Sequence, residues 1–206
     1  VMSVIMLVSI GQSTTSSVSS SISSMGSDLL TASITDEDIE LTEADFMVLA
    51  DYDAISAVAP YLTASATARY ESAYCGVSAL GITEDYMDVE GVKLQSGRGI
   101  VPSDVAWRTG VCVIGTDVAG DLFESYDVIG KSITMSNRTF EIVGLMDETG
   151  NETDSQVLIP LTTAQRVSDS TAISTAYIRA ADTDNVAYAQ SLTEYYLYSL
   201  TGDEDA

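Results

Sequence analysis

The chain has no histidine, and this absence excludes several kinds of site. It is 206 residues long and contains His 0. Ser-His-Asp and Cys-His catalysis use an imidazole as the general base, and ordinary His-ligated zinc uses it as a ligand. None of these sites can be built from this sequence.

Basic residues are also scarce. The chain has 8 Lys and Arg against 31 Asp and Glu, so its formal net charge is -23. Contacts to phosphate need Lys and Arg, and we therefore expect no nucleic-acid partner. The acidic surplus predicts a solvated, self-repelling surface. A calcium site in the acidic run 147–154 is the alternative, but that run does not match the EF-hand spacing, so we expect no metal and no other cofactor.

Only two cysteines are present, too few for a four-ligand metal site. Cys75 and Cys112 both lie on predicted strands. Two buried thiols is one interpretation. A disulfide between them is the alternative, and it would require a location outside the cytoplasm.

Nucleotide-binding glycine motifs are missing as well. The segment I-G-K-S at 129–132 resembles the end of a P-loop, but Ser125 stands where the first glycine should be. The segment also leads into a predicted strand instead of a helix. The paired carboxylates lie in polar runs, where the raised pKa that a glycosidase needs is not expected. We expect that this chain is not an enzyme.

The centre of the chain predicts a small β-rich unit. Residues 111–114 form a short apolar run that predicts a buried strand, and Thr116 can cap a short helix. Residues 131–136 and 139–143 alternate, and only Asn137 and Arg138 separate them, which predicts a two-residue hairpin. The inward-facing side chains are then Ile133, Met135, Phe140 and Ile142.

Three helices are predicted around this unit. Capping boxes at Thr42–Asp45 and Thr162–Gln165 open helices toward Ala50 and Val167. A third helix is expected over 184–200, because four apolar residues recur on one face: Ala189, Leu192, Tyr196 and Leu200. Further strands are expected at 29–34, 157–159 and 176–179, with two strands or one long bent strand over 63–80.

The N-terminal residues carry two separate patterns. Residues 1–10 are apolar but would span only about 15 Å as a helix, half of a bilayer core. Within the Ser-rich segment that follows, Val18, Ile22, Met25 and Leu29 recur at spacings typical of one helical face. This pattern predicts a stalk helix, with a flexible linker as the alternative.

Several of these segments resemble one protein family. Four segments resemble the MacB-type core domain in the same order: I-G-T-D-V-A-G-D-L-F from Ile114, V-I-G-K-S-I from Val128, F-E-I-V-G-L-M from Phe140 and V-L-I-P-L-T-T-A-Q from Val157. Upstream, Val58-Ala59-Pro60 and the run from Gly76 to Arg98 are similar too, with Gly81, Gly97 and Arg98 in place. The MacB-type core domain is the extracytoplasmic domain of ABC-transporter permeases in the MacB/FtsX/LolC superfamily.

The resemblance implies an α+β fold of two lobes. Residues 31–75 and 156–206 would form a porter-like β-α-β lobe, and residues 76–155 would form a mainly β, Sabre-like insertion. Residues 1–30 would hold the end of a first transmembrane helix and the stalk helix.

The resemblance also implies a function without catalysis. The domain would lie outside a cell membrane, in the periplasm or at the cell surface. It would couple ATP hydrolysis in the cytoplasm to substrate movement or efflux outside, by mechanotransmission. The implied partners are a cytoplasmic ABC ATPase subunit or domain, a second permease protomer in a dimer, and a membrane-fusion adaptor or a cell-wall hydrolase.

Two alternatives remain open at this point. An FtsX-like domain would bind and activate a cell-wall hydrolase. A free secreted binding protein would use residues 1–10 as part of a signal peptide.

Overall fold

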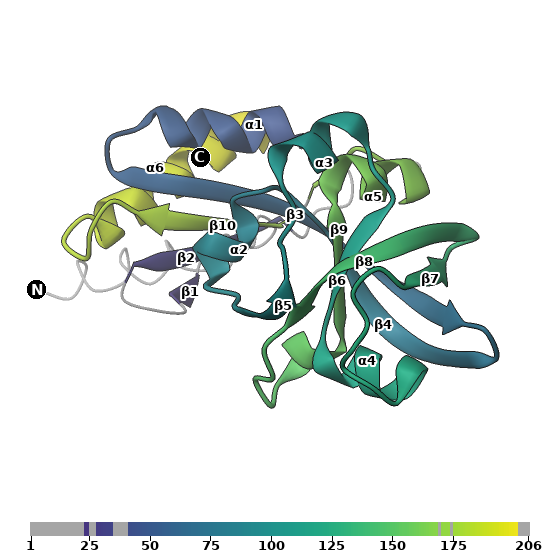
Figure 1. Ribbon diagram of the computed structural model, residues 1–206. Coiled ribbons are helices and arrows are strands. Elements are labelled where there is room, and N and C mark those ends of the chain that lie inside the picture. The colour runs from purple at the N-terminus through teal and green to yellow at the C-terminus, as the bar shows by residue number, and fades with distance from the viewer. Residues whose placement is uncertain (1–22, 25–27, 35–40, 169, 174, 202–206) are drawn as a thin grey trace, which may run out of the picture.

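One large twisted sheet with helices against it forms the part of the chain that the structure describes (Figure 1). The structure is a computed structural model, and it describes residues 23–24, 28–34, 41–168, 170–173 and 175–201. The strand order is β1-β2-β10-β3-β4-β9-β6-β8-β5, and β7 pairs with β3 and β8 off this path. The fold is therefore mixed α and β and rich in strands.

The elements have the following bounds. The strands are β1 (Ser23–Ser24), β2 (Leu29–Ser33), β3 (Ile55–Tyr70), β4 (Ala73–Ile82), β5 (Leu94–Gly97), β6 (Val111–Ile114), β7 (Ser132–Met135), β8 (Arg138–Met146), β9 (Gln156–Pro160) and β10 (Thr175–Ala180). The helices are α1 (Glu43–Met47), α2 (Tyr86–Glu90), α3 (Pro102–Trp107), α4 (Thr116–Phe123), α5 (Leu161–Ser168) and α6 (Val186–Thr201), with 3-10 turns at Val48–Asp51 and Glu152–Ser155.

The strand β3 joins the two ends of the molecule. It has 16 residues, which is about 50 Å of extended chain. Its first part pairs with β10 from Ile55 to Tyr61, and from Tyr61 onward it pairs with β4 in a hairpin that ends at Tyr70 and Ala73. This region is thus two strands, one of the two arrangements expected.

Three apolar clusters form the core, and β3 contributes to each of them. The first cluster, which contains Val58, lies between the β2–β10–β3 part of the sheet and the helices α1 and α6. The second, which contains Ala68 and Phe140, lies around β6, β7, β8 and α4. The third, which contains Ala59, lies between the sheet and α2 and α3.

The β7–β8 hairpin forms as predicted, but its turn lies one residue earlier. Met135 pairs with Arg138, and the turn residues Ser136 and Asn137 have φ values of 47° and 60°. Arg138 belongs to the strand. The pair of positive φ values is typical of a type I′ turn, which matches the twist of the flanking strands. The four predicted inward-facing side chains, Ile133, Met135, Phe140 and Ile142, are all buried.

The first capping box is confirmed and the second is wrong. The backbone N–H and the hydroxyl of Thr42 both donate to Asp45 Oδ2, at 2.8 Å and 2.7 Å. At the second box, α5 begins already at Leu161, so Thr162 lies inside the helix. Its hydroxyl donates instead to the Val105 carbonyl at the neighbouring helix α3, and so ties two elements together.

Two other helix predictions need correction. Gly115, and not Thr116, is the N-cap of α4. On α6 the fully buried seam is Ala189, Thr193 and Leu197, whereas Leu200 is 39% exposed. Sequence periodicity missed this seam because it contains a threonine, whose hydroxyl is satisfied by the Ala189 carbonyl one turn earlier.

The structure describes only a small part of the predicted N-terminal stalk. Ser23 and Ser24 form β1, which pairs antiparallel with β2 opposite Thr31 and Leu30. These two serines, and Leu29 of β2, therefore lie in strands and not in the stalk helix expected within residues 1–30. Val18, Ile22 and Met25 lie outside the described residues. Among the residues that the structure covers, no helix has both the length and the apolar character to cross a membrane.

Candidate functional site

The two cysteines are free thiols. Cys112 is fully buried in β6, and Cys75 is partly exposed on β4. Burial, together with the nearby charge of Asp121, raises the pKa of the Cys75 thiol to about 11. Burial and Glu141 also raise the pKa of Cys112. Neither thiol is poised as a nucleophile, because only the thiolate is reactive. The structure contains the pair of thiols and not the disulfide.

The acidic run from 147 to 154 is a structured turn. Asp154, which is 3% exposed, accepts hydrogen bonds from the backbone N–H groups of Thr149 and Gly150 and from the Thr149 hydroxyl. Burial alone would raise the pKa of Asp154, but these hydrogen bonds outweigh it and lower the pKa. The carboxylate is thus committed to closing the turn. Within the described ranges, no group of three or more His, Cys, Asp or Glu side chains could hold a metal ion.

A tyrosine triad joins three elements on one side of the sheet. Tyr61 on β3, Tyr86 on α2 and Tyr177 on β10 have ring centroids 5.0 to 5.6 Å apart, and the Tyr61 and Tyr86 rings meet edge to face. Side-chain hydrogen bonding links the Tyr177 hydroxyl to the hydroxyls of Tyr61 and Tyr86. Burial raises the pKa of all three phenols. The triad therefore keeps its protons and binds α2 to the sheet, and it offers no general base.

A carboxylate faces this triad from the end of α2. Glu90 lies near all three phenols, and burial raises its pKa. Its Oε2 atom is buried and has no hydrogen-bond partner among the described residues. Arg179 lies in the same region but donates to the Val89 carbonyl at 2.6 Å and pairs with Asp28 at 3.7 Å. Glu90 is therefore an uncompensated, partly buried acid.

Three tyrosines of α6, Tyr188, Tyr195 and Tyr196, line a shallow groove. It is formed with Tyr52 and has a volume of about 520 Å³. Tyr188 and Tyr195 are 61% and 76% exposed, whereas Tyr196 packs against the first core cluster. This arrangement of one packed ring among exposed ones is the one usual for tyrosines on a surface helix.

The residues that carried the family resemblance hold elements close together. A Cβ at Gly81 would meet the Ala164 Cβ at 2.2 Å, so this glycine lets α5 rest directly on β4. Gly97 has φ +83° and lies against the backbone of β8. Arg98 pairs with Asp104 at 2.6 Å and thereby fixes the start of α3. Sequence patterns alone predicted neither this ion pair nor the tyrosine triad.

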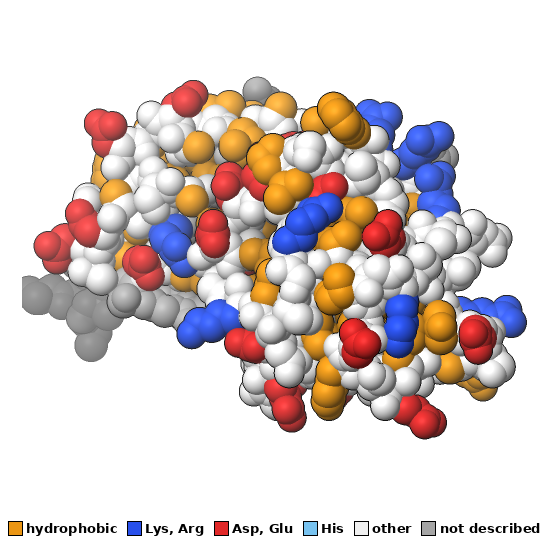
Figure 2. Space-filling view, in the orientation of Figure 1, with side chains coloured by type: hydrophobic (Ala, Val, Ile, Leu, Met, Phe, Trp, Pro, Cys, Tyr) orange, Lys and Arg blue, Asp and Glu red, His pale blue; other side chains and the backbone are white. Residues whose placement is uncertain are grey.

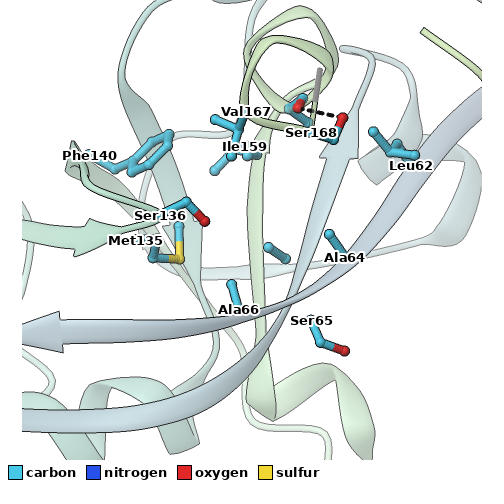
Figure 3. Close-up of a pocket in the computed structure, with 12 residues that line it drawn as sticks. Leu62, Ala64, Ser65, Ala66, Met135, Ser136, Phe140, Ile159, Val167 and Ser168 are labelled. Atoms are coloured by element: carbon cyan, nitrogen blue, oxygen red, sulfur yellow. Dashed lines mark hydrogen bonds between the residues drawn. The ribbon is translucent and has the colours of Figure 1, made fainter. Parts of the chain in front are cut away.

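A small apolar cavity lies beside the middle of β3. Its volume is about 150 Å³. Figure 3 shows its lining side chains, which come from β3, from the end of β7 with the turn residue Ser136, and from the helix α5, together with Phe140 and Ile159. Its lining residues are Leu62, Ala64, Ser65, Ala66, Ala79, Met135, Ser136, Phe140, Ile159, Ala164, Val167 and Ser168. None of them is charged.

The described residues thus offer two hollows, one lined by apolar residues and one by the tyrosines of α6, and a partly buried acid, Glu90, whose Oε2 atom has no hydrogen-bond partner among them. A family model described as the MacB-like periplasmic core domain matches residues 1–195 of this sequence. The chain belongs to this family. The resemblance found in the sequence is thus confirmed.

Curated relatives agree with this membership. The chain is 29% identical to the macrolide export ATP-binding/permease protein MacB of Bartonella henselae over 98% of its own length and 33% of the relative. It is 27% identical to the protein of the same name from Marinobacter nauticus, over 100% of its own length and 34% of the relative. The chain thus spans about a third of the length of these curated relatives.

Two solved structures share the fold. The periplasmic region of MacB from Actinobacillus actinomycetemcomitans matches with a TM-score of 0.75 and 22% identity, over 87% of this chain and 86% of the other. The extracellular domain of the noncanonic ABC-type transporter YknZ from Gram-positive bacteria matches with a TM-score of 0.74 and 20% identity, over 85% and 95%.

Proposed function

We propose that this chain is the extracytoplasmic domain of a MacB-type ABC-transporter permease and that it transmits motion without catalysing a reaction. The domain would lie in the periplasm or at the cell surface, attached to a permease in the cell membrane. A cytoplasmic ABC ATPase would supply the motion, and a second permease protomer would complete a dimer. A membrane-fusion adaptor is the outer partner that fits an export function.

The single observation that carries this proposal is the position of the first and last described elements. The strands β1 and β2 and the helix α6 lie at the same end of the molecule (Figure 1), and α6 packs over β2 through the first core cluster. Segments that enter and leave the domain would therefore meet it at one end, as a membrane-anchored domain requires. From there, β2 pairs with β10 and β10 pairs with β3, which runs to the opposite end. These hydrogen-bonded strands form a stiff path along which a displacement could travel.

We further propose the division into two lobes. The first core cluster draws its residues from 30–62 and 161–197, and all of them but Leu30 fall within the porter-like lobe of 31–75 and 156–206. The Sabre-like lobe would be 76–155. Residues 1–30 would contain the end of a transmembrane helix and the stalk, with Val18, Ile22 and Met25 facing a second protomer or the returning chain.

The test is a change in stiffness upstream of the domain. Two glycines inserted after Ser20 in the full transporter would make the stalk flexible, because glycine-rich segments behave as random coil. The names of the relatives make macrolide resistance of the host cells the first activity to assay. We expect ATP hydrolysis to persist while this resistance falls to that of cells without the transporter. The matched control is the same insertion between Glu71 and Ser72, at the exposed tip of the β3–β4 hairpin, which should leave resistance unchanged. Resistance that survives the insertion after Ser20 would show that the segment is only a tether.

A further inference from the structure

One edge of β3 is open between two neighbouring strands. On this edge, β10 pairs with β3 from Ile55 to Tyr61, and β7 pairs with it only at Arg69. Between these points no described residue pairs with this edge, while β4 pairs with the opposite edge from Tyr61 to Tyr70. The sheet therefore has a gap that is closed at both ends by strands.

Backbone groups in this gap are available for pairing. In an antiparallel ladder, every second residue turns its N–H and C=O groups to the same side. Tyr70 and Ala73 flank the two-residue turn of the β3–β4 hairpin and pair with each other, so the even-numbered residues of this part of β3 turn their backbone groups to β4. Thr63, Ser65 and Thr67 therefore turn theirs into the gap. All three are exposed. An unpaired strand edge of this kind is a template for another strand.

The apolar cavity lies directly beside this edge. Ala64 and Ala66 point toward it, whereas Ser65 points away (Figure 3). Side chains of a strand alternate between the two faces of a sheet. A strand added at the gap would thus direct alternate side chains to the cavity side, between the turn residue Ser136 and Val167 of α5. A volume of about 150 Å³ is enough for one branched or aromatic group.

The charge around the gap differs from that of the molecule as a whole. The chain has 31 acidic residues and 8 basic ones, yet no acidic residue lines the cavity. Two basic residues adjoin its lining in the chain: Arg138, which follows the hairpin turn, and Arg166, which precedes Val167. Arg69 faces the same side of the sheet as Ser65 and donates to the Glu71 carbonyl. On the face in Figure 2, basic side chains gather at the upper right, over the region of α5. The rim therefore favours an acidic ligand.

We propose that the open edge of β3 from Thr63 to Thr67, together with the cavity, binds an extended segment of a partner protein by strand addition. We call this site the β3 slot. Its ligand is a short acidic peptide that pairs with the β3 backbone and inserts one apolar side chain into the cavity. Backbone pairing supplies affinity and the side-chain pocket supplies specificity in this mode of recognition. The inference does not depend on the proposed mechanotransmission.

The experiment selects ligands without assuming a sequence. A phage-displayed library of random octapeptides is selected against the 206-residue chain, and the enriched peptide is synthesised and titrated by fluorescence polarisation. We expect enriched sequences with one Leu, Ile or Phe flanked by Asp or Glu.

Two variants of the chain test the site. Ser65→Pro removes an N–H from the open edge without touching the β4 ladder, and Ala66→Phe fills the cavity. Each should weaken binding about tenfold or more, which corresponds to about 1.4 kcal/mol, because Ser65→Pro removes a backbone hydrogen bond and Ala66→Phe excludes the apolar side chain of the peptide from the cavity. The matched control Ser65→Ala should bind within about twofold of the parent, because it keeps the backbone N–H. Melting curves establish that each variant is folded.

Four outcomes would overturn the proposal. The selection enriches nothing, or the peptide binds Ser65→Pro and Ala66→Phe as well as it binds the parent chain. The parent chain dimerises in sedimentation and both variants abolish this, which makes a second copy the occupant. Finally, the peptide binds only after the acidic segment 36–40 is replaced by Gly and Ser. This result would mean that the chain's own segment occupies the β3 slot and excludes the peptide.

Discussion

Glu90 is a carboxylate whose surroundings oppose its charge. Burial raises its pKa above the ordinary value of 4.5, and its Oε2 atom has no hydrogen-bond partner among the described residues. A raised pKa means that the folded state holds the proton more tightly than the unfolded chain does. The stability gained from the protonated form is full below about pH 4.5 and is lost as pH rises through the folded-state pKa.

Glu90→Gln is therefore expected to stabilise the protein at pH 7. Glutamine keeps the shape and has no charge to desolvate. Because Glu90 is only partly buried, solvent screens its charge, and a gain of up to about 1 kcal/mol would raise the melting temperature by up to about 2–4 °C in a domain of this size. Thermal melts at pH 7 and pH 4 measure the effect, which should shrink toward zero at the lower pH. The control is Asp88→Asn on the exposed side of the same helix. A destabilised Glu90→Gln variant at pH 7 would mean that the carboxylate has a stabilising partner.

Phe140 is the large side chain at the centre of the second core cluster. It is 1% exposed and also lines the cavity beside β3. Phe140→Ala should cost about 3–5 kcal/mol, because it removes buried apolar surface and enlarges a void. Chemical denaturation measures this loss against Thr139→Ala, an exposed neighbour that should change stability by less than about 0.5 kcal/mol. Equal stability of the two variants would place the ring outside the core.

At the scale of elements, the turn between β7 and β8 decides between two registers. Ser136 and Asn137 have positive φ, whereas Arg138 is a strand residue. Asn137→Gly should stabilise by about 0.5–1 kcal/mol, because glycine adopts positive φ without steric cost and favours this turn type.

The matched variant Arg138→Gly should destabilise by a similar amount, because glycine weakens a strand. Denaturation midpoints of both variants against the parent chain give the answer. The opposite order would return the turn to Asn137-Arg138, where the sequence pattern alone had placed it.

Helices and strands were predictable from the sequence wherever their signal lay within a few neighbouring residues. The strand at 111–114, the hairpin faces and the Thr42 capping box depend on residues a few positions apart, and the structure has them. The second capping box failed because Thr162 finds its acceptor on α3, 57 residues away. The prediction of the buried face of α6 was wrong because Thr193 counts as polar in a sequence pattern although it is buried.

The candidate sites were less predictable for the same reason. The tyrosine triad joins Tyr61, Tyr86 and Tyr177 from three distant segments. The β3 slot exists only because β10 ends and β7 begins on the same edge of one long strand. Neither leaves a pattern within any short window of sequence.

At the scale of the whole molecule, the net charge of -23 should set the response to salt. Self-repulsion destabilises a compact state, and the Debye length falls from about 30 Å at 0.01 M to about 3 Å at 1 M ionic strength. The melting temperature should therefore rise by several degrees when NaCl is raised over this range.

The control is CaCl₂ at equal ionic strength. Divalent ions screen somewhat better, so a slightly larger rise still agrees with screening. A rise that saturates at low millimolar calcium would contradict it and point to a specific site instead.

The length of β3 also constrains how the chain can change. Its side chains face alternate sides of the sheet along all 16 residues, and the strand contributes to three core clusters. Deleting one residue at Ala64 would turn every later side chain to the opposite face. Ala68 would leave the second cluster while Ile55 and Val58 kept their places in the first. Insertions and deletions should therefore be inherited only at turns such as Glu71–Ser72, and the spacing between Val58 and Ala68 should stay fixed as homologous sequences diverge.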